Sequence, residues 1–365
     1  MLNKFINIRV SLRLLIAVFP GVCFAMFFHN EIWFLVSFFA ACGIIPYGSS
    51  HSNKTILLIS VTLIFMLSII TAMLISSHQI TFIIFICFAV TAIGFLDTNN
   101  KQFKSIGSWF LIGIIYTGFK LHSSIDSISR ITMMQVYIAS IMSCLPAFLI
   151  KEKHTIELNF KLKFRKFDIP DYLKYLLPIA IVLVLWQTYS FSKPEWLLWS
   201  SLSVVSLELS SSSKKMRDRI VGGIIGIALG VAIVSFLPIT DYNSYAYPNR
   251  LGFLYPSLLA TAQFRGAENL NIVPLAIRIG LPICYIGIII SLRLFKTYIY
   301  GFTMRCTLIV LAAGPAWHLI GIARITNVVI GGTIGYICVL VLCLIKHKMT
   351  EYAQNAPGGI VPKNQ

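Results

Sequence analysis

The sequence predicts an all-α fold: a polytopic transmembrane helix bundle of about twelve spans, arranged as two parallel six-helix repeats. Two observations lead to this prediction. Apolar residues make up 57% of the 365 positions and charged residues only 12%, far from the balance of a soluble domain. Long apolar runs also recur along the chain, and because about 20 apolar residues cross a bilayer, little of it remains for a soluble domain.

The apolar runs fall into two sets of six, separated by a basic stretch. The first set lies at about 12–29, 31–48, 55–76, 80–96, 106–120 and 132–150, and the second at about 173–191, 195–210, 220–239, 272–291, 297–314 and 321–345. The run at 106–120 is short for a span. We expect a first repeat at 1–150, a basic cytoplasmic linker at 151–172, a second repeat at 173–345 and a cytoplasmic tail at 346–365.

The basic residues indicate the orientation of the bundle, because Lys and Arg in short loops stay on the cytoplasmic side. With the N-terminus inside, 22 of the 30 Lys and Arg lie on inner segments, 5 in outer loops and 3 within spans. Both termini are then cytoplasmic. The net charge of +17 reflects topology and contact with anionic lipid headgroups, so no nucleic-acid partner is expected.

One further segment, Leu251–Phe264, is moderately apolar. A thirteenth crossing here would place the basic residues 346–348 outside, against the charge rule. We therefore expect it to be a packed loop or a re-entrant part of the outer segment 240–271.

Weak internal similarity favours a duplicated bundle. An offset of 163 aligns Trp33 with Trp196 and Ser37 with Ser200. Two halves of six spans point the same way, so they are parallel repeats related by an axis along the membrane normal. Transporters commonly place their substrate path where such repeats meet, which favours a carrier or a pore.

The candidates for a substrate path are polar residues within or beside the spans of the second half: Arg278, Arg305, Arg324, Asn327 and Glu208. An arginine within a span is costly unless it faces the bundle interior or a water-filled path, or unless its long side chain reaches the membrane surface. Glu208 could pair with a neighbouring arginine or accept a proton in a coupled cycle.

A serine-rich segment, Ser210–Arg219, is expected to be a cytoplasmic turn. Its basic side chains are Lys214, Lys215, Arg217 and Arg219. They are typical of a cytoplasmic loop, and such a cluster at a pore mouth would also gather anions. Trp196 and Trp199 precede this segment at the outer end of a span, a position typical of an anchoring aromatic belt.

Glycines recur at intervals of four residues in two spans of the second half. They are Gly222, Gly226 and Gly230 in one span and Gly331 and Gly335 in the other. This spacing places the glycines on one face of a helix and lets a neighbouring backbone approach closely. We expect helix packing from them and no ligand binding.

Two short motifs in the second half resemble those of a known family: Arg-x-x-Gly-x-x-x-Gly at Arg219, Gly222 and Gly226, and Arg-x-x-Asn-x-x-x-Gly at Arg324, Asn327 and Gly331. Over about 173–345 the chain resembles the fusaric-acid-resistance (FUSC) type family of integral membrane transporters, which includes aromatic acid exporters. The family carries Asp where this chain has Asn327, so a charge beside Arg324 is missing.

The resemblance implies export of aromatic or other hydrophobic organic anions across a bacterial inner membrane, in some members with a periplasmic adaptor protein. The expected partners are the lipid bilayer, a small organic anion, such an adaptor docked on the outer segment 240–271, and a second copy of the chain.

Three functions stay open from the sequence. A GxxxxGK[ST] loop is missing, so an exporter would need a proton gradient or a partner to drive it. Few acids lie within the spans, which favours an anion channel as the alternative. A membrane-embedded transferase would use His318, but no carboxylate lies near it in the sequence. The cysteines and histidines show no metal-ligand spacing, so we expect no metal and no cofactor. We also expect that the chain is not an enzyme, because no group of acids supports catalysis.

Overall fold

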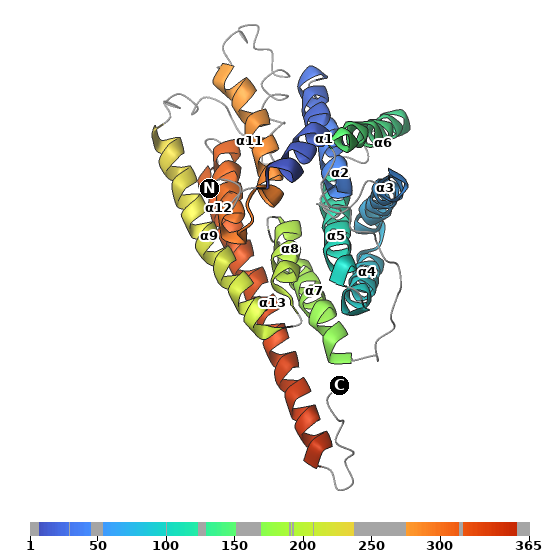
Figure 1. Ribbon diagram of the computed structural model, residues 1–365, viewed down its shortest axis with the longest axis vertical. Helices are drawn as coiled ribbons and strands as arrows, with labels where there is room; N and C mark the ends of the chain where they lie inside the picture. The colour runs from blue at the N-terminus through green and yellow to red at the C-terminus, as the bar shows by residue number, and fades with distance from the viewer. Residues whose placement is uncertain are drawn as a thin grey trace.

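The computed structural model is all-helical over the residues that it describes (Figure 1). These are 7–28, 30–44, 54–99, 101–122, 129–150, 169–189, 191, 193–206, 208–236, 275–313 and 317–355. The α-helices of the first half are α1 (Ile8–Phe27), α2 (Phe34–Ile44), α3 (Lys54–Ser77), α4 (Gln79–Asn99), α5 (Lys101–His122) and α6 (Arg130–Cys144). Those of the second half are α7 (Ile169–Thr188), α8 (Pro194–Val204), α9 (Leu209–Phe236), α11 (Leu275–Leu294), α12 (Tyr298–Ala313) and α13 (Trp317–Asn355). Two short 3₁₀ helices, η2 (Glu31–Trp33) and η5 (Leu145–Leu149), adjoin α2 and α6.

Each of these α-helices coincides with one of the predicted apolar runs, but several differ in length. Helix α5 has 22 residues and is longer than the expected run at 106–120. Helix α13 has 39 residues and continues through the first ten positions of the expected tail, because Lys, Met, Glu, Tyr, Ala and Gln sustain a helix there. The segment 240–271, including Leu251–Phe264, lies outside the described residues, as does most of the linker 151–172.

Helix α8 is shorter than the expected run, with 11 residues; α2 also has 11 residues and ends where the described residues end, at Ile44. Within α8, Ser201 Oγ donates to the Leu198 carbonyl at 2.9 Å and Ser203 Oγ to the Ser200 carbonyl at 3.0 Å. The helix ends at Val204, and the C-cap residue Val205 is not helical, with φ -58° and ψ 132°. The expected span at 195–210 is therefore wrong in length.

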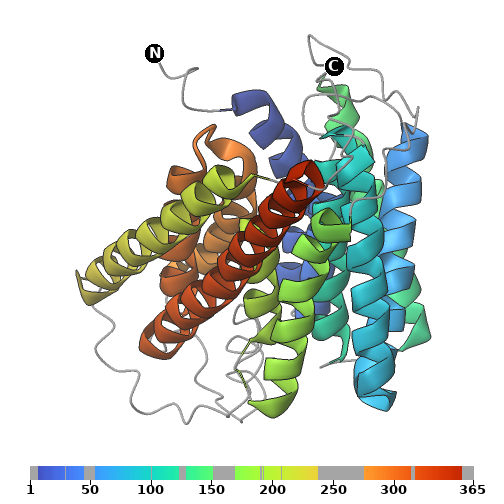
Figure 2. The ribbon, with the colours of Figure 1, turned by 90° about the horizontal axis from the view of Figure 1, so that it is seen from below.

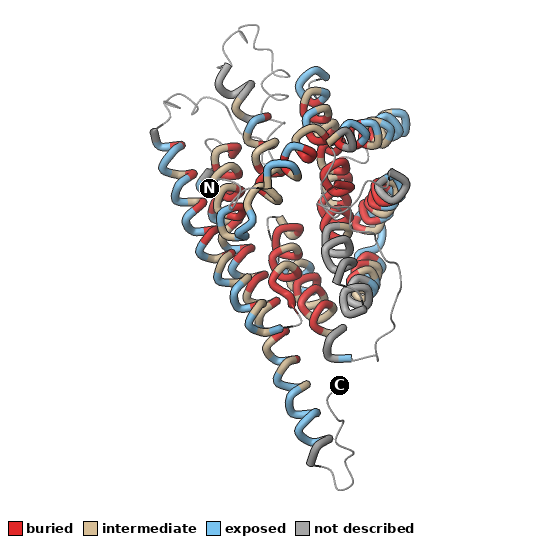
Figure 3. Tube along the Cα trace, viewed as in Figure 1, coloured by how far each residue is buried: buried red, intermediate tan, exposed pale blue. Residues whose placement is uncertain are grey.

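Four helical segments are long and apolar enough to cross a membrane, by length and composition: Ile8–Phe27, Leu58–Ser77, Leu209–Ser235 and His318–Tyr352. Figure 3 shows which residues of these helices are exposed, and many of the exposed residues are large and apolar. Helix α3 exposes Met66 and Met73, and α9 exposes Ile224 and Leu229. Because such faces suit lipid and not water, the chain is a membrane protein.

The helices pair in a similar way within each half (Figures 1 and 2). In the first half, α3 and α4 pack on α5, and α2 packs on α1 and α6. In the second half, α9 and α11 pack on α12, and α8 packs on α7 and α13. The two halves meet where α4 contacts α7, where α1 contacts α11 and where α5 contacts α8. The long helices α9 and α13 lie side by side along one flank.

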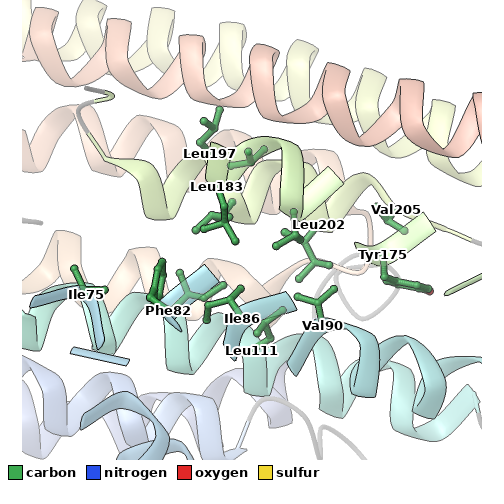
Figure 4. Close-up of a cluster of buried hydrophobic side chains, with 14 of the residues drawn as sticks. Ile75, Phe82, Ile86, Val90, Leu111, Tyr175, Leu183, Leu197, Leu202 and Val205 are labelled. Atoms are coloured by element: carbon green, nitrogen blue, oxygen red, sulfur yellow. The ribbon is translucent and has the colours of Figure 1, made fainter. Parts of the chain in front are cut away.

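The largest cluster of buried apolar side chains lies at this contact between the halves (Figure 4). The first half contributes Ile75, Phe82, Ile86, Val90 and Leu111, and the second contributes Tyr175, Leu183, Leu197, Leu202 and Val205. In a bilayer, lipid tails are as apolar as these side chains, so the contact is stabilised by close packing more than by exclusion of water. It anchors the α7–α8 hairpin against the first half.

The glycines that recur along α9 and α13 lie at close contacts of these helices with α12 and α8. On α9, a Cβ at Gly230 would lie 2.7 Å from the Cβ of Val310 on α12, and Thr307 Oγ1 donates to the Gly226 carbonyl at 2.9 Å. On α13, a Cβ at Gly331 would lie 2.5 Å from the Leu197 carbonyl oxygen of α8. Gly222 and Gly335 contact the same two partner helices, α12 and α8. These positions therefore hold α9 on α12 and α13 on α8.

We predict that Gly331→Ala lowers the free energy of unfolding by about 1–3 kcal/mol, because the added methyl group meets backbone that cannot move aside. Thermal unfolding in detergent measures the change. The control is Gly280→Ala on α11, where a Cβ meets nothing within 4 Å. A Gly331 variant as stable as its control would contradict the close approach of α13 to α8.

Candidate functional site

Three arginines from three helices of the second half meet inside the bundle. Arg219 lies on α9, Arg305 on α12 and Arg324 on α13, and their side chains are 1%, 4% and 1% exposed. We call them the arginine cluster. Charged side chains are rarely buried without partners, because burial in a medium of low dielectric constant costs several kcal/mol per ion. The cluster is therefore the first candidate for a functional site.

Aromatic rings form the surface on which the three guanidinium groups lie. The ring centroid of Phe302 is 4.8, 5.7 and 5.5 Å from the guanidinium carbons of the three arginines in chain order. For Trp199 these distances are 5.9, 5.2 and 5.9 Å. Such cation–π contacts are worth about 2 kcal/mol when desolvated, which offsets part of the burial cost but does not cancel the charge.

Trp196 lies on the same surface, with its ring centroid 4.9 Å from the guanidinium carbon of Arg324. It is only 3% exposed, so the expectation of an anchoring belt at the membrane surface is wrong for Trp196. Trp196 and Trp199 are one helical turn apart on α8, and this spacing presents both rings to one side of the helix. The close approach of α8 to α13 at Gly331 brings that side to Arg324.

Neutral hydroxyl groups supply the hydrogen bonds that the structure gives the cluster. Arg219 donates to Ser200 Oγ at 3.5 Å and also to Ser203 Oγ, and Arg305 Nε donates to Ser291 Oγ at 3.3 Å. Nε of Arg219, and Nε and Nη2 of Arg324, are buried and have no hydrogen-bond acceptor among the described residues. Among the described residues, the arginine cluster therefore has hydrogen-bond donors without acceptors and a positive charge that its hydrogen bonds to serines do not neutralise.

The first half reaches the cluster through Tyr116 of α5. Its ring meets Trp199 edge-on, with centroids 5.3 Å apart, and stacks on Phe38 of α2 at 5.7 Å. Tyr116 also lies close enough to Arg324 for an electrostatic interaction. The site is therefore at the contact between the halves.

Asn327 lies one turn beyond Arg324 and is 2% exposed. Its Nδ2 donates to the Lys193 carbonyl at 3.5 Å, and Lys193 holds a left-handed φ of 105° just before Pro194. Asn327 therefore fixes the turn that leads into α8. Its Oδ1 is buried without a hydrogen-bond partner among the described residues.

The other predicted residues lie elsewhere. Glu208 is exposed just before α9, outside the cluster. Lys215 donates to the Val205 carbonyl at 3.3 Å, and Arg217 has a 72% exposed side chain 3.9 Å from Asp218. The side chain of Arg278, on α11, lies outside the described residues.

The expected turn at 210–219 is wrong in structure: these residues form the first turns of α9. Lys214 and Arg217 are exposed, whereas Arg219 is buried in the cluster. The physical reason is helical periodicity, because Arg219 lies on the face of α9 that carries Gly222 and Gly226 toward α12.

Sequence reasoning assigned no role in a substrate site to Phe302, Trp199 or Tyr116. A usable signal was present: two tryptophans one turn apart in a serine-rich helix, which can present aromatic faces and hydroxyl groups to the same buried cations. His318 is exposed in the first turn of α13. Among the described residues, no group of His, Cys, Asp and Glu could hold a metal ion.

No family profile, no curated protein and no solved structure matches this chain. The chemistry of the site therefore rests on its own geometry. Three buried guanidinium groups with spare donors attract an anion, and the surrounding rings suit an anion with an aromatic or apolar body.

We predict that Arg305→Met raises the free energy of unfolding of the ligand-free protein by about 1–4 kcal/mol, because it removes one desolvated charge that two like charges repel. If the cluster binds an organic anion, benzoate should stabilise the unaltered protein against thermal unfolding, and the same variant should lose this stabilisation. Both effects are measured by thermal unfolding in detergent with and without benzoate. Arg217→Met, at an exposed position, is the control and should change neither. A less stable Arg305 variant would mean that the cluster serves the fold.

Proposed function

We propose that this chain is a membrane transporter that exports aromatic or other hydrophobic organic anions, and that it acts without catalysis. The observation that carries the proposal is the arginine cluster, buried on a surface of Phe302, Trp196 and Trp199 at the contact between the halves. Intramembrane charges usually mark a substrate or ion path. An organic anion would neutralise part of the cluster, and its body would pack against the rings.

The proposal includes twelve spans in two equivalent repeats. The pairing of α3, α4 and α5 is repeated by α9, α11 and α12, and that of α1, α2 and α6 by α7, α8 and α13. The contacts between halves, α4 with α7 and α11 with α1, exchange under the same correspondence. This exchange is what a two-fold axis between the halves produces, and it supports a duplicated bundle; the even number of six spans in each half is the reason to propose parallel repeats.

The sequence supports the same correspondence beyond the first offset. Arg130–Thr132 of α6 and Arg324–Thr326 of α13 both read Arg-Ile-Thr, at an offset of 194. This offset is 31 positions larger than the offset of 163 that aligns α2 with α8. The difference is close to the 32-residue length of the segment 240–271. A single insertion between α9 and α11 accounts for the difference.

We further propose a bacterial inner-membrane location with both termini in the cytoplasm, on the basis of the charge distribution and the resemblance to the FUSC-type family. A periplasmic adaptor on the segment 240–271 and assembly with a second copy of the chain belong to the same proposal. Deletion of 240–271 should impair export and leave membrane insertion intact where an adaptor docks there; unimpaired export would refute the adaptor.

An anion channel is the second candidate, and one observation favours it. Among the described side chains only one carboxylate, Glu195, is buried, so a chain of acids that could relay protons is missing from the part of the bundle that is described. Fixed arginines can guide an anion through a pore without a coupled proton. Conductance across a planar bilayer, in place of saturable flux, would identify a channel.

We predict that cells expressing the chain export a loaded aromatic carboxylate, and that Arg305→Gln lowers the initial rate at least tenfold because it removes one cation from the cluster. Efflux of benzoate and 4-hydroxybenzoate, with and without an uncoupler, is the measurement. Arg217→Gln is the control, since its side chain is exposed. Equal efflux from the Arg305 variant and its control would contradict the proposed role of the cluster.

A further inference from the structure

The hydrogen-bond donors of the arginine cluster that lack an acceptor among the described residues lie on two different arginines. Nε and Nη2 of Arg324 are buried and have no such acceptor, and neither has Nε of Arg219. The two other nitrogens of Arg219 donate to Ser203 and Ser200. An anion in the site would therefore meet donors from two guanidinium groups on two helices, α13 and α9.

The two nitrogens of Arg324 suit a single carboxylate. The N–H bonds of Nε and Nη2 run parallel along one edge of a planar guanidinium group, and such a pair matches the two oxygens of a carboxylate. One carboxylate is therefore enough to satisfy this edge of Arg324. Nε of Arg219 belongs to another guanidinium group, so it calls for a second acceptor.

The positive charge around the site also exceeds the charge of one carboxylate. The cluster holds three guanidinium groups, and the half-buried Lys120 and Lys193 add two ammonium groups near Glu195, the one buried acid among the described side chains. Five cations against one carboxylate leave a surplus that a monoanion reduces by one charge and a dianion by two. Because buried like charges are costly, a dianion lowers the electrostatic free energy of the site further.

The two guanidinium groups lie over the same pair of rings. The ring centroid of Phe302 is 4.8 Å from the guanidinium carbon of Arg219 and 5.5 Å from that of Arg324. The ring centroid of Trp199 is 5.9 Å from both. A flat ligand that packs on these rings would therefore have one arginine within reach of each of two substituents.

We propose that the preferred ligand of the arginine cluster is an aromatic dicarboxylate. One carboxylate accepts from Nε and Nη2 of Arg324, and the other accepts from Nε of Arg219. This proposal rests on the proposed function and narrows it, from organic anions in general to those with two carboxylates on one aromatic ring. Arg219 is then the residue that distinguishes a dianion from a monoanion.

The test is isothermal titration calorimetry of the purified full chain in detergent at pH 8. The ligands are phthalate, isophthalate and terephthalate, each compared with its own monomethyl ester, which keeps the ring and one carboxylate but lacks the second charge. At least one dicarboxylate should bind roughly tenfold more tightly than its ester, because the ester loses a charge-assisted hydrogen bond. The three ligands also differ in the spacing of their carboxylates, so the tightest one reports the spacing of the two donor groups.

Arg219→Gln should bring the ratio of the two dissociation constants, ester over dicarboxylate, close to one. The matched control is Arg217→Gln, two residues earlier on the same helix and exposed, which should keep the ratio of the unaltered protein. If the Arg219 variant does not fold, the comparison of each acid with its ester in the unaltered protein still decides the question.

Esters that bind as tightly as their dicarboxylates at all three ring positions would overturn the proposal and leave the proposed function standing. A preference for the dicarboxylate that persists in folded Arg219→Gln would overturn the assignment of the second carboxylate to Arg219. Absence of binding by every dicarboxylate, every ester and benzoate would contradict the proposed function itself, and the dicarboxylate site with it.

Discussion

The burial of three guanidinium groups is the constraint on which the second half of the molecule depends. Arg219, Arg305 and Arg324 come from three different helices, so the charges can meet only if α9, α12 and α13 pack closely. Glycines at the helix contacts permit that approach. The short helix α8 then completes the site, because its tryptophans and serines supply ring faces and hydroxyl groups that lower the cost of burial without cancelling the charge.

The two halves share a pattern of helix contacts but differ in chemistry. Helices α9 and α12 carry Arg219 and Arg305, whereas α3 and α5 meet through the neutral residues Ser68 and Thr117, whose hydroxyl groups contact each other. Thr117 also donates to the Gly113 carbonyl of its own helix at 2.5 Å. These neutral groups are therefore hydrogen-bonded within the first half. The first half therefore contributes the ring of Tyr116 to the edge of the site, and the second half contributes the buried arginines.

Much of the fold followed from the sequence, because apolar runs and glycine spacing depend on local order along the chain. The positions of Arg305 and Arg324 within spans already indicated a buried site. Its composition could not be predicted, since it depends on which helices pack together. Arg219 was assigned to a turn because it ends a serine-rich basic segment between two apolar runs, and Trp196 to a membrane surface because of its place at a span end. The helix lengths were also missed, since α8 ends at Val204, before the end of the apolar run that contains it.

The most direct test of an anion site in the arginine cluster is a crystal structure of the full chain with 4-bromobenzoate, measured at the bromine absorption edge. The anomalous signal locates the ligand independently of any variant. We predict one bromine peak beside the rings of Trp199 and Phe302, with the carboxylate directed at Arg305 and Arg324. Peaks confined to the lipid-facing surface, or no peak at a concentration that saturates binding in solution, would contradict the assignment of the cluster as the anion site.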